Sequence, residues 1–319
     1  MSTKRPYFQL VDGVPRPPII DPVVFKRSLH RKFKEGDVLL STYPKSGTKW
    51  LVYIMQLILK EGKPVISFAD FTANACSVEF TNDEDRRTKL PLQIHFTHHP
   101  LRRENMGEAA KFVYIARNPW DVCVSFYHMV KDLSVYRFQD GSFDDFLEAF
   151  LAGDFGFGSY FEHVASGYAL KDEPHVFFTT YEELKRDTKG TVLRLAYFLG
   201  ERYGRILGDV DNGMLDRLLE RCTPQYMKDV MVVHFKNTSD TGWHAQAARN
   251  QMTSATGYQG DKNKYSIVRN AKIGSWKDTF TSDQLCRLEA KIVEEGDRAS
   301  FMSLWEDIRR EARSLSEQP

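Results

Sequence analysis

The chain has 319 residues, of which 42% are hydrophobic and 27% are charged, and its formal net charge is +1 at pH 7. A chain of this length can bury a large core, and its near-neutral charge argues against a broad attraction to nucleic acid or to a membrane surface. Any anion site must therefore be local. We expect a single domain without nucleic-acid or membrane partners.

The spacing of the cysteines and the N-terminal residues indicate the cellular compartment of the protein. The four cysteines, at positions 76, 123, 222 and 286, show no close pairing, which fits free thiols in a reducing compartment. The first residues lack the apolar run of a signal peptide. The longest apolar stretch, about ten residues from Trp50, is too short to span a bilayer. These features predict a cytoplasmic protein.

The elements can be predicted in chain order. Residues 1–36, which contain four prolines between positions 15 and 22, are expected to form an irregular N-terminal arm, and residues 37–315 a single domain. Apolar runs predict strands at 37–40, 92–96, 112–116 and 176–179. Apolar periodicity predicts helices at 51–59, 119–131, 143–152, 158–170, 188–200, 213–221, 282–295 and 300–313.

This alternation of strands and helices is typical of an α/β fold. We expect a mainly parallel sheet of about five strands with helices on both faces. Residues 232–272 are polar and show no clear period. Such a long segment is usually a functional loop or a disordered one.

The ten residues Ser41-Thr42-Tyr43-Pro44-Lys45-Ser46-Gly47-Thr48-Lys49-Trp50 join the first predicted strand to a buried helix. The first amides of a helix lack intrahelical partners, and the helix dipole favours negative charge there. Lys45 adds a mobile cation, and Ser46, Thr48 and Lys49 add donors. We therefore expect this loop to bind a phosphate or a sulfate ester. The plainer alternative is an ordinary turn with a capping serine.

The ATP-binding P-loop, G-x-x-x-x-G-K-[ST], does not fit this segment. Thr42 stands where its first glycine would be, and Lys45 precedes Gly47 instead of following it.

Two further segments follow predicted strands. Arg117 comes directly after the strand 112–116, and Ser125 lies on the helix that Pro119 opens, so both can reach one anion at the carboxyl end of the sheet. Taken alone, Arg117 would be a surface ion pair and Ser125 a buried hydroxyl. His98 follows the strand 92–96 and is a natural general base for an acceptor hydroxyl.

Two neighbouring histidines flank this candidate base. His95 is expected in the core and His99 in a solvated loop. A zinc cluster of the three is possible in spacing, but no nearby cysteine or acid completes it, and we expect no metal site.

Together with Arg269-Asn270-Ala271-Lys272-Ile273-Gly274-Ser275-Trp276-Lys277, these segments resemble the cytosolic sulfotransferases over about residues 20–310. The resemblance implies a P-loop-like core. It also implies that 3′-phosphoadenosine 5′-phosphosulfate (PAPS) is the sulfuryl donor, that adenosine 3′,5′-bisphosphate (PAP) is released, and that no metal is required. His98 would deprotonate the acceptor, while Lys45 would neutralise the leaving oxygen.

The resemblance also implies a set of residues that bind the nucleotide: Lys45, Ser46, Gly47, Thr48, Lys49, Trp50, Arg117, Ser125, Tyr181, Cys222, Arg269, Asn270 and Ala271. Several of them depart from the family pattern. Lys49 replaces a threonine, so one contact to the 5′-phosphate would become ionic. Asn270 and Ala271 replace a lysine and a glycine. Cys222-Thr223 replaces Thr-Ser near the adenine, and Pro224 replaces a phenylalanine.

The acceptor would sit beside His98. Its walls are expected from Phe71, Phe80, Phe96 and Met129, with Phe96 standing where the family often has a lysine. Such an aromatic pocket favours small phenols and catechols over sugars. Asp70 and Glu79 would receive the ammonium of an aromatic monoamine, unless they are simply solvated. Bulky steroids rank third.

Two other functions remain open from the sequence. One is a catalytically impaired carrier of PAP or PAPS on the same fold, since the departures above could disable turnover. The other is a nucleotide-dependent small-molecule kinase, which should show a Walker lysine and a magnesium-binding carboxylate. The family's dimer motif is also altered here, with Ser282 and Cys286 in place of Val and Glu, so we expect a monomer or a weak homodimer.

Overall fold

The computed structural model of the chain describes residues 4–81, 88–107, 109–236 and 243–317. In these ranges five strands form one parallel sheet in the order β4-β5-β3-β6-β7. The strands are β3 (Asp37–Ser41), β4 (Ala75–Ser77), β5 (Gln93–Thr97), β6 (Lys111–Ala116) and β7 (Val176–Thr180). The predicted α/β domain with about five mainly parallel strands is confirmed. Within the same ranges no helix combines the length and the apolar character needed to cross a membrane.

The middle of the sheet is buried, and one of its rows is wholly apolar. Leu40 of β3 pairs with Phe96 of β5 and Val113 of β6, and all three side chains are buried. A parallel strand that is covered on both faces needs such continuous apolar runs. This explains why β3 and β6 could be recognised as short unbroken apolar segments.

Helices follow most of the strands. Those before β7 are α1 (Pro22–Ser28), α2 (Thr48–Leu59), α3 (Phe68–Ala73), α4 (Pro119–Asp132), α5 (Phe143–Ala152) and α6 (Tyr160–Tyr168). Those after it are α7 (Tyr181–Arg186), α8 (Thr188–Leu199), α9 (Glu201–Gly208), α10 (Met214–Arg221), α11 (Pro224–Val230), α12 (Trp243–Arg249), α13 (Ser282–Glu295) and α14 (Glu306–Ser316). Short 3₁₀ turns are η1 (Arg103–Asn105), η2 (Ser134–Tyr136), η3 (Val210–Asn212), η4 (Ser275–Asp278) and η5 (Gly296–Trp305).

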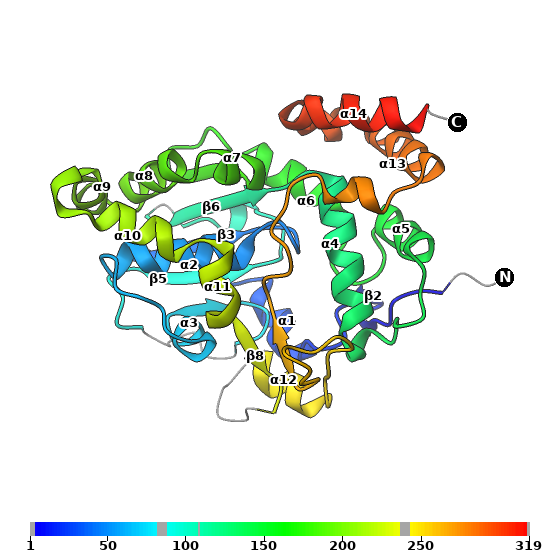
Figure 1. The fold of residues 1–319 in the computed structure, drawn as a ribbon, viewed down its shortest axis with the longest axis horizontal. Helices are drawn as coiled ribbons and strands as arrows, with labels where there is room; N and C mark the ends of the chain where they lie inside the picture. The colour runs from blue at the N-terminus through cyan, green and yellow to red at the C-terminus, as the bar shows by residue number, and fades with distance from the viewer. Residues whose placement is uncertain (1–3, 82–87, 108, 237–242, 318–319) are drawn as a thin grey trace.

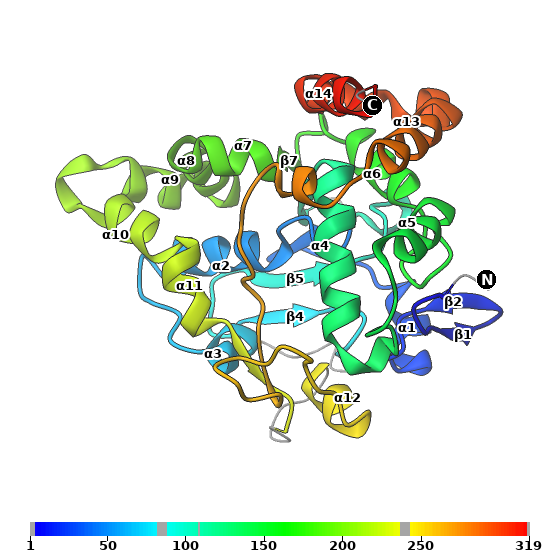
Figure 2. The ribbon, with the colours of Figure 1, turned by 45° about the vertical axis from the view of Figure 1, so that its right-hand side comes forward.

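The layers around the sheet can be followed in Figures 1 and 2. α2 packs on β5 and on α8, and α8 in turn packs on β7. In Figure 2 the arrowheads of β4 and β5 point toward α4, which therefore lies at the carboxyl ends of the strands. α13 and α14 pack on each other, and α13 also contacts α5. The end of the sheet where α4 lies is the usual place for a ligand in an open α/β fold.

Three sequence-based expectations were wrong in detail. The N-terminal arm is not irregular, because β1 (Gln9–Val11) and β2 (Val14–Arg16) form a hairpin and α1 follows. The turn between them is Asp12-Gly13 with φ angles of 52° and 77°, a pair of residues typical of tight hairpins. Residues 232–272 contain a second hairpin, β8 (Val232–His234) with β9 (Lys264–Ser266), and the helix α12.

The third difference concerns the C-terminal part. The helix expected at 300–313 starts only at Glu306, because residues 296–305 form the 3₁₀ segment η5.

Candidate active site

The loop between β3 and α2 turns sharply at two positions. Lys45 and Gly47 have positive φ angles of 70° and 108°. The N-cap of α2 is Gly47, and within the described residues no side chain caps this helix N-terminus. A Cβ at Gly47 would lie only 3.0 Å from Cδ2 of Tyr181 and 3.2 Å from Cδ1 of Ile115. The loop therefore presents backbone donors and the positive end of a helix dipole, which together suit an anion.

Three cationic side chains meet at this loop. Lys45, Arg117 and Arg269 line one cavity of about 290 Å³, although they come from three distant parts of the chain. Burial, and then repulsion from Arg269 and Arg117, lowers the pKa of Lys45 to about 8. Burial and the nearby Arg117 likewise lower the pKa of Arg269. Like charges brought this close are stabilised by an anion bound between them.

Arg117 is fixed by its surroundings. Its guanidinium donates hydrogen bonds to the carbonyls of Lys45 (3.2 Å) and Lys272 (2.9 Å), and it lies 4.2 Å from the ring centroid of Tyr181. Its Nε is buried and has no hydrogen-bond partner among the described residues. A buried guanidinium with an unused donor can form one more hydrogen bond, for example to an oxygen of an anion.

Asp121 brings the distant Arg269 segment to this place. The carboxylate is fully buried at the start of α4 and accepts hydrogen bonds from the amide of Gly274 (2.9 Å) and the hydroxyl of Ser275 (3.2 Å). Asn118 caps α4 by accepting a 2.8 Å bond from the amide of Asp121. As a result, Arg269, Asn270 and Ala271 line the cavity.

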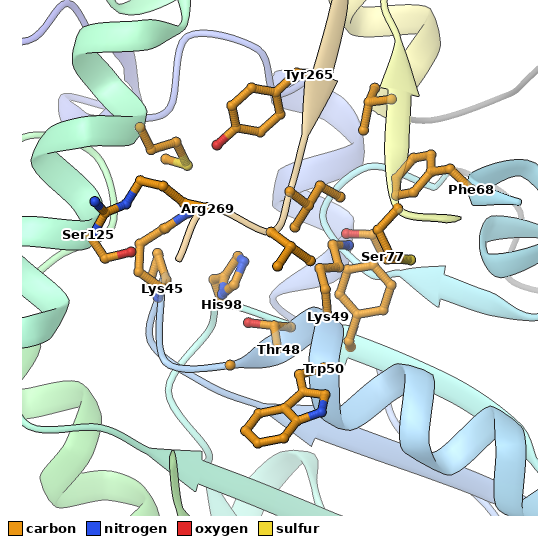
Figure 3. A pocket seen from close by; sticks show the side chains of 18 of the residues that line it. Lys45, Thr48, Lys49, Trp50, Phe68, Ser77, His98, Ser125, Tyr265 and Arg269 are labelled. Atoms are coloured by element: carbon orange, nitrogen blue, oxygen red, sulfur yellow. The ribbon is translucent and has the colours of Figure 1, made fainter. Parts of the chain in front are cut away.

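Ser125 and Met129, both on α4, line the same cavity. In Figure 3 the side chains of Ser125, Lys45 and Arg269 lie close together on one side of the pocket. His128 stands one residue before Met129, and burial followed by repulsion from Arg269 lowers its pKa to about 4. His128 is therefore neutral and adds no charge to the cation cluster.

An aromatic wall stands beside the loop. The rings of Trp50 and Tyr181 meet edge to face with centroids 5.4 Å apart, and both line the cavity. Trp50 Nε1 donates a 2.9 Å hydrogen bond to the carbonyl of Cys222, which fixes the indole. The Cys222 side chain itself is buried and is not part of the cavity wall, nor is that of Ser46.

His98 faces the cavity from the end of β5. Its Nδ1 lies 2.7 Å from the carbonyl oxygen of Thr42, and because a carbonyl can only accept, Nδ1 carries the proton. Nε2 then keeps its lone pair. Burial lowers the pKa of His98, so the ring is neutral near pH 7 and can accept a proton.

The two neighbouring histidines point elsewhere. His95 Nε2 lies 3.2 Å from Asp37 Oδ1 in the core, as expected. His99 is only partly exposed, because its Nε2 lies 2.7 Å from the hydroxyl of Ser28 and its ring packs against Phe25. In the described part of the chain no three His, Cys, Asp or Glu side chains are placed to hold a metal ion.

The apolar side of the cavity contains most of the predicted acceptor wall. Phe80, Phe96 and Met129 line it, as does Phe68. Phe71 does not, because it is fully buried and stacks on Phe68 with centroids 5.7 Å apart.

The two acids considered as ammonium receptors are not part of the cavity wall. Asp70 pairs with Lys60 at 3.0 Å, so the expectation that it receives a substrate ammonium is wrong. Glu79 is buried and accepts a hydrogen bond from the backbone amide of His98.

Several wall residues were missed from the sequence. They come from the N-terminal arm and from the segment around the β8–β9 hairpin: Pro17, Ile19, Met231, Val233, Tyr265, Ile267 and Val268. The alternation of Tyr265 and Ile267 with polar residues was a local signal of a strand with one buried face. Nothing in the sequence around Pro17 showed that the arm folds back over the site.

The fold and the site thus define an α/β protein with a cluster of cationic side chains at the carboxyl ends of its strands and a neutral histidine beside an apolar cavity. The sulfotransferase domain model matches residues 35–297. Because this match covers most of the chain, the protein belongs to the sulfotransferase family.

Individual relatives agree with this assignment. Sulfotransferase 1A1 of Bos taurus is 30% identical over 85% of this chain and 86% of its own length. Sulfotransferase 2A1 of Mus musculus is also 30% identical, over 86% of this chain and 89% of its own. Among solved structures, mouse SULT7A1 complexed with PAP superposes with a TM-score of 0.65 at 21% identity, covering 96% of this chain and 98% of that one. This last similarity concerns the fold.

Proposed function

We propose that the protein transfers a sulfuryl group from PAPS to the hydroxyl, or the amine, of a small acceptor and releases PAP. The observation that carries the proposal is the arrangement inside one cavity. Three cations and an uncapped helix N-terminus lie on one side, and the free Nε2 of His98 faces the same space. A donor with anionic groups at both ends would meet the cations, and an acceptor bound against the apolar wall would meet the base.

The residues present fit a nucleotide with phosphates at two ends. Lys45, Thr48 and the first amides of α2 would hold the 5′-phosphosulfate. Arg117, with its unused Nε, would hold the 3′-phosphate together with Ser125 and Arg269. The adenine would lie against Trp50.

The chemistry that these residues support is an in-line transfer. His98 Nε2 takes the proton of the acceptor hydroxyl while the acceptor oxygen forms a bond to sulfur. The bond between sulfur and the bridging phosphate oxygen breaks at the same time. Lys45 and the loop amides stabilise the charge that develops on that oxygen. PAP is already a good leaving group, so the proposal needs no metal ion.

The cavity supports a flat aromatic acceptor. Phe80, Phe96 and Met129 surround the space beside His98 with apolar surface, where the many hydroxyls of a sugar would lose water without gaining partners. Phenols and catechols therefore rank first. Aromatic monoamines rank lower than the sequence suggested, since Asp70 is paired with Lys60. We further propose that the protein works in the cytoplasm. We also propose that it is a monomer or a weak dimer, and light scattering would measure this oligomeric state.

Incubation with labelled PAPS and a panel of phenols, catechols, amines and steroids tests the proposal. Label should appear in a phenolic product both with and without a chelator. Tight PAP binding without any transfer would favour the carrier instead. Transfer of phosphate from ATP would favour a kinase.

A further inference from the structure

Lys49 is the second residue of α2, but its ammonium does not join the cation cluster at the loop. Its Nζ lies 3.6 Å from the ring centroid of Phe96 and 5.5 Å from that of Phe71. In Figure 3, Lys45 and Arg269 lie on one side of His98, and Lys49 lies on the other, near Ser77. The cavity thus has a second, separate cation on the side that the proposed function gives to the acceptor.

The electrostatic neighbours of the two lysines confirm this separation. Lys45 is affected by Arg269 and Arg117. Lys49 is instead affected by Glu79, and it acts in turn on His98. The ammonium of Lys49 therefore belongs to the surroundings of the base.

Lys49 is not paired with an acid in the part of the chain that the structure describes. Among the described residues it forms no ion pair and no hydrogen bond, and its ammonium rests on the face of an aromatic ring. The charge of Glu79 acts on Lys49 without forming an ion pair with it, and the Oε1 atom of Glu79 accepts bonds from Thr97 and His98 while its Oε2 has no partner among the described residues. Burial lowers the pKa of Lys49 to about 7, which shows how strongly this apolar site disfavours an unpaired charge. A ligand carboxylate could supply the missing partner.

We propose that Lys49 selects acceptors that carry an anionic group, so that the preferred substrates are phenols with a carboxylate on a short side chain. This inference rests on the proposed function for the reaction but concerns only the acceptor subsite. The aromatic ring of such a compound would lie against Phe80 and Phe96 while its carboxylate pairs with Lys49. Its phenolic hydroxyl would remain free to approach His98. An amine in the same place would be repelled.

Binding to the PAP-bound protein tests this by calorimetry, without any need for turnover. The probes are 3-(4-hydroxyphenyl)propanoate and the corresponding amide, which have nearly the same shape and differ in charge. The wild type should bind the acid at least tenfold more tightly at pH 6. The preference should shrink at pH 9, because Lys49 loses its proton above about pH 7.

Three variants locate the effect. Lys49→Met should reduce the preference to less than threefold, whereas Lys49→Arg should keep it. Lys111→Met is the matched control, because it removes another ammonium that lies over a ring. Lys111 is on β6, outside the cavity, and its Nζ lies 5.1 Å from the ring centroid of Phe198 on α8. It should leave the preference unchanged. PAP affinity, measured in parallel, shows that each variant is folded.

Equal affinities for the acid and the amide in the wild type would overturn the inference, as would a preference that survives in Lys49→Met. A clear acid preference without sulfuryl transfer from PAPS would uphold the anion subsite and contradict the proposed function. Sulfuryl transfer from PAPS to neutral phenols alone would uphold the proposed function and contradict the anion subsite.

Discussion

The buried carboxylate of Glu79 accepts a hydrogen bond from the backbone amide of His98. The same oxygen accepts the hydroxyl of Thr97 at 2.7 Å. Glu79 lies in the connection between β4 and β5. Its hydrogen bonds therefore hold this connection against the turn after β5, which carries His98. The negative charge of Glu79 also raises the pKa of His98 and partly opposes the effect of burial. Glu79 is therefore a positioning residue for the base.

Replacing Glu79 with glutamine tests this role through the pH profile. Loss of the negative charge removes a stabilising influence on protonated His98, so the pKa of His98 should fall. Activity needs neutral His98, and the acid limb of kcat/KM should move to lower pH. A change in kcat alone, with the acid limb unmoved, would show that Glu79 acts only in the structure. Glu220→Gln, the same change at an exposed position of α10 outside the cavity, is a control that should leave the limb in place.

Lys45→Met should reduce turnover by at least about 10²-fold, since groups that stabilise developing charge typically contribute that much. A second readout comes from its pKa of about 8. At pH 8 a bound anion would draw Lys45 into its charged form, so PAP binding should take up protons. Calorimetry in buffers of different ionisation enthalpy measures this uptake. It should decrease in Lys45→Met, and an unchanged uptake would contradict the role of Lys45.

The 3′-phosphate site can be tested by comparing PAP with AMP. PAP at about 100 times its dissociation constant should stabilise the protein by about 2.7 kcal/mol. AMP at the same concentration should stabilise it far less, because it lacks the group that Arg117 and Arg269 would bind. Arg269→Ala should narrow this difference in melting temperature, while Arg205→Ala on the exposed face of α9 should not. Equal stabilisation by AMP and PAP would refute the assignment.

Ala271 lies in the cavity wall with a φ of 50°, a backbone conformation that favours glycine. Ala271→Gly should therefore raise the free energy of unfolding by about 0.5–1 kcal/mol in urea denaturation, after the entropy cost of glycine is included. Ala165→Gly in the middle of α6 is the contrasting control and should lower stability by about 1 kcal/mol. If both changes destabilise equally, the strain at Ala271 is not relieved by glycine.

Much of the sheet and the loop after β3 could be predicted from the sequence because their signals are local. Buried parallel strands are short apolar runs, and α4 begins with a capping Asn118 followed by Pro119. These two features placed Lys45 and Arg117 at the same edge of the sheet. The structure brings both residues into one cavity with His98.

Other parts depended on packing between distant segments. β4 has only three residues, too few for a period to be recognised. The direction of Lys49 could not be read from its position, because the ring of Phe96 that attracts its ammonium lies on another element. Phe71 and Cys222 matched the expected residue types, but their side chains are buried outside the cavity wall.

The central claim is that His98 is the base in a transfer from PAPS, and single-turnover transfer of labelled sulfuryl groups tests it most directly. The wild type should transfer label from PAPS to its best phenolic acceptor. His98→Ala should lower that rate by at least about 10²-fold and keep its affinity for PAP within twofold. Transfer by His98→Ala at nearly the wild-type rate would contradict the account, as would a wild type that binds PAPS and transfers nothing.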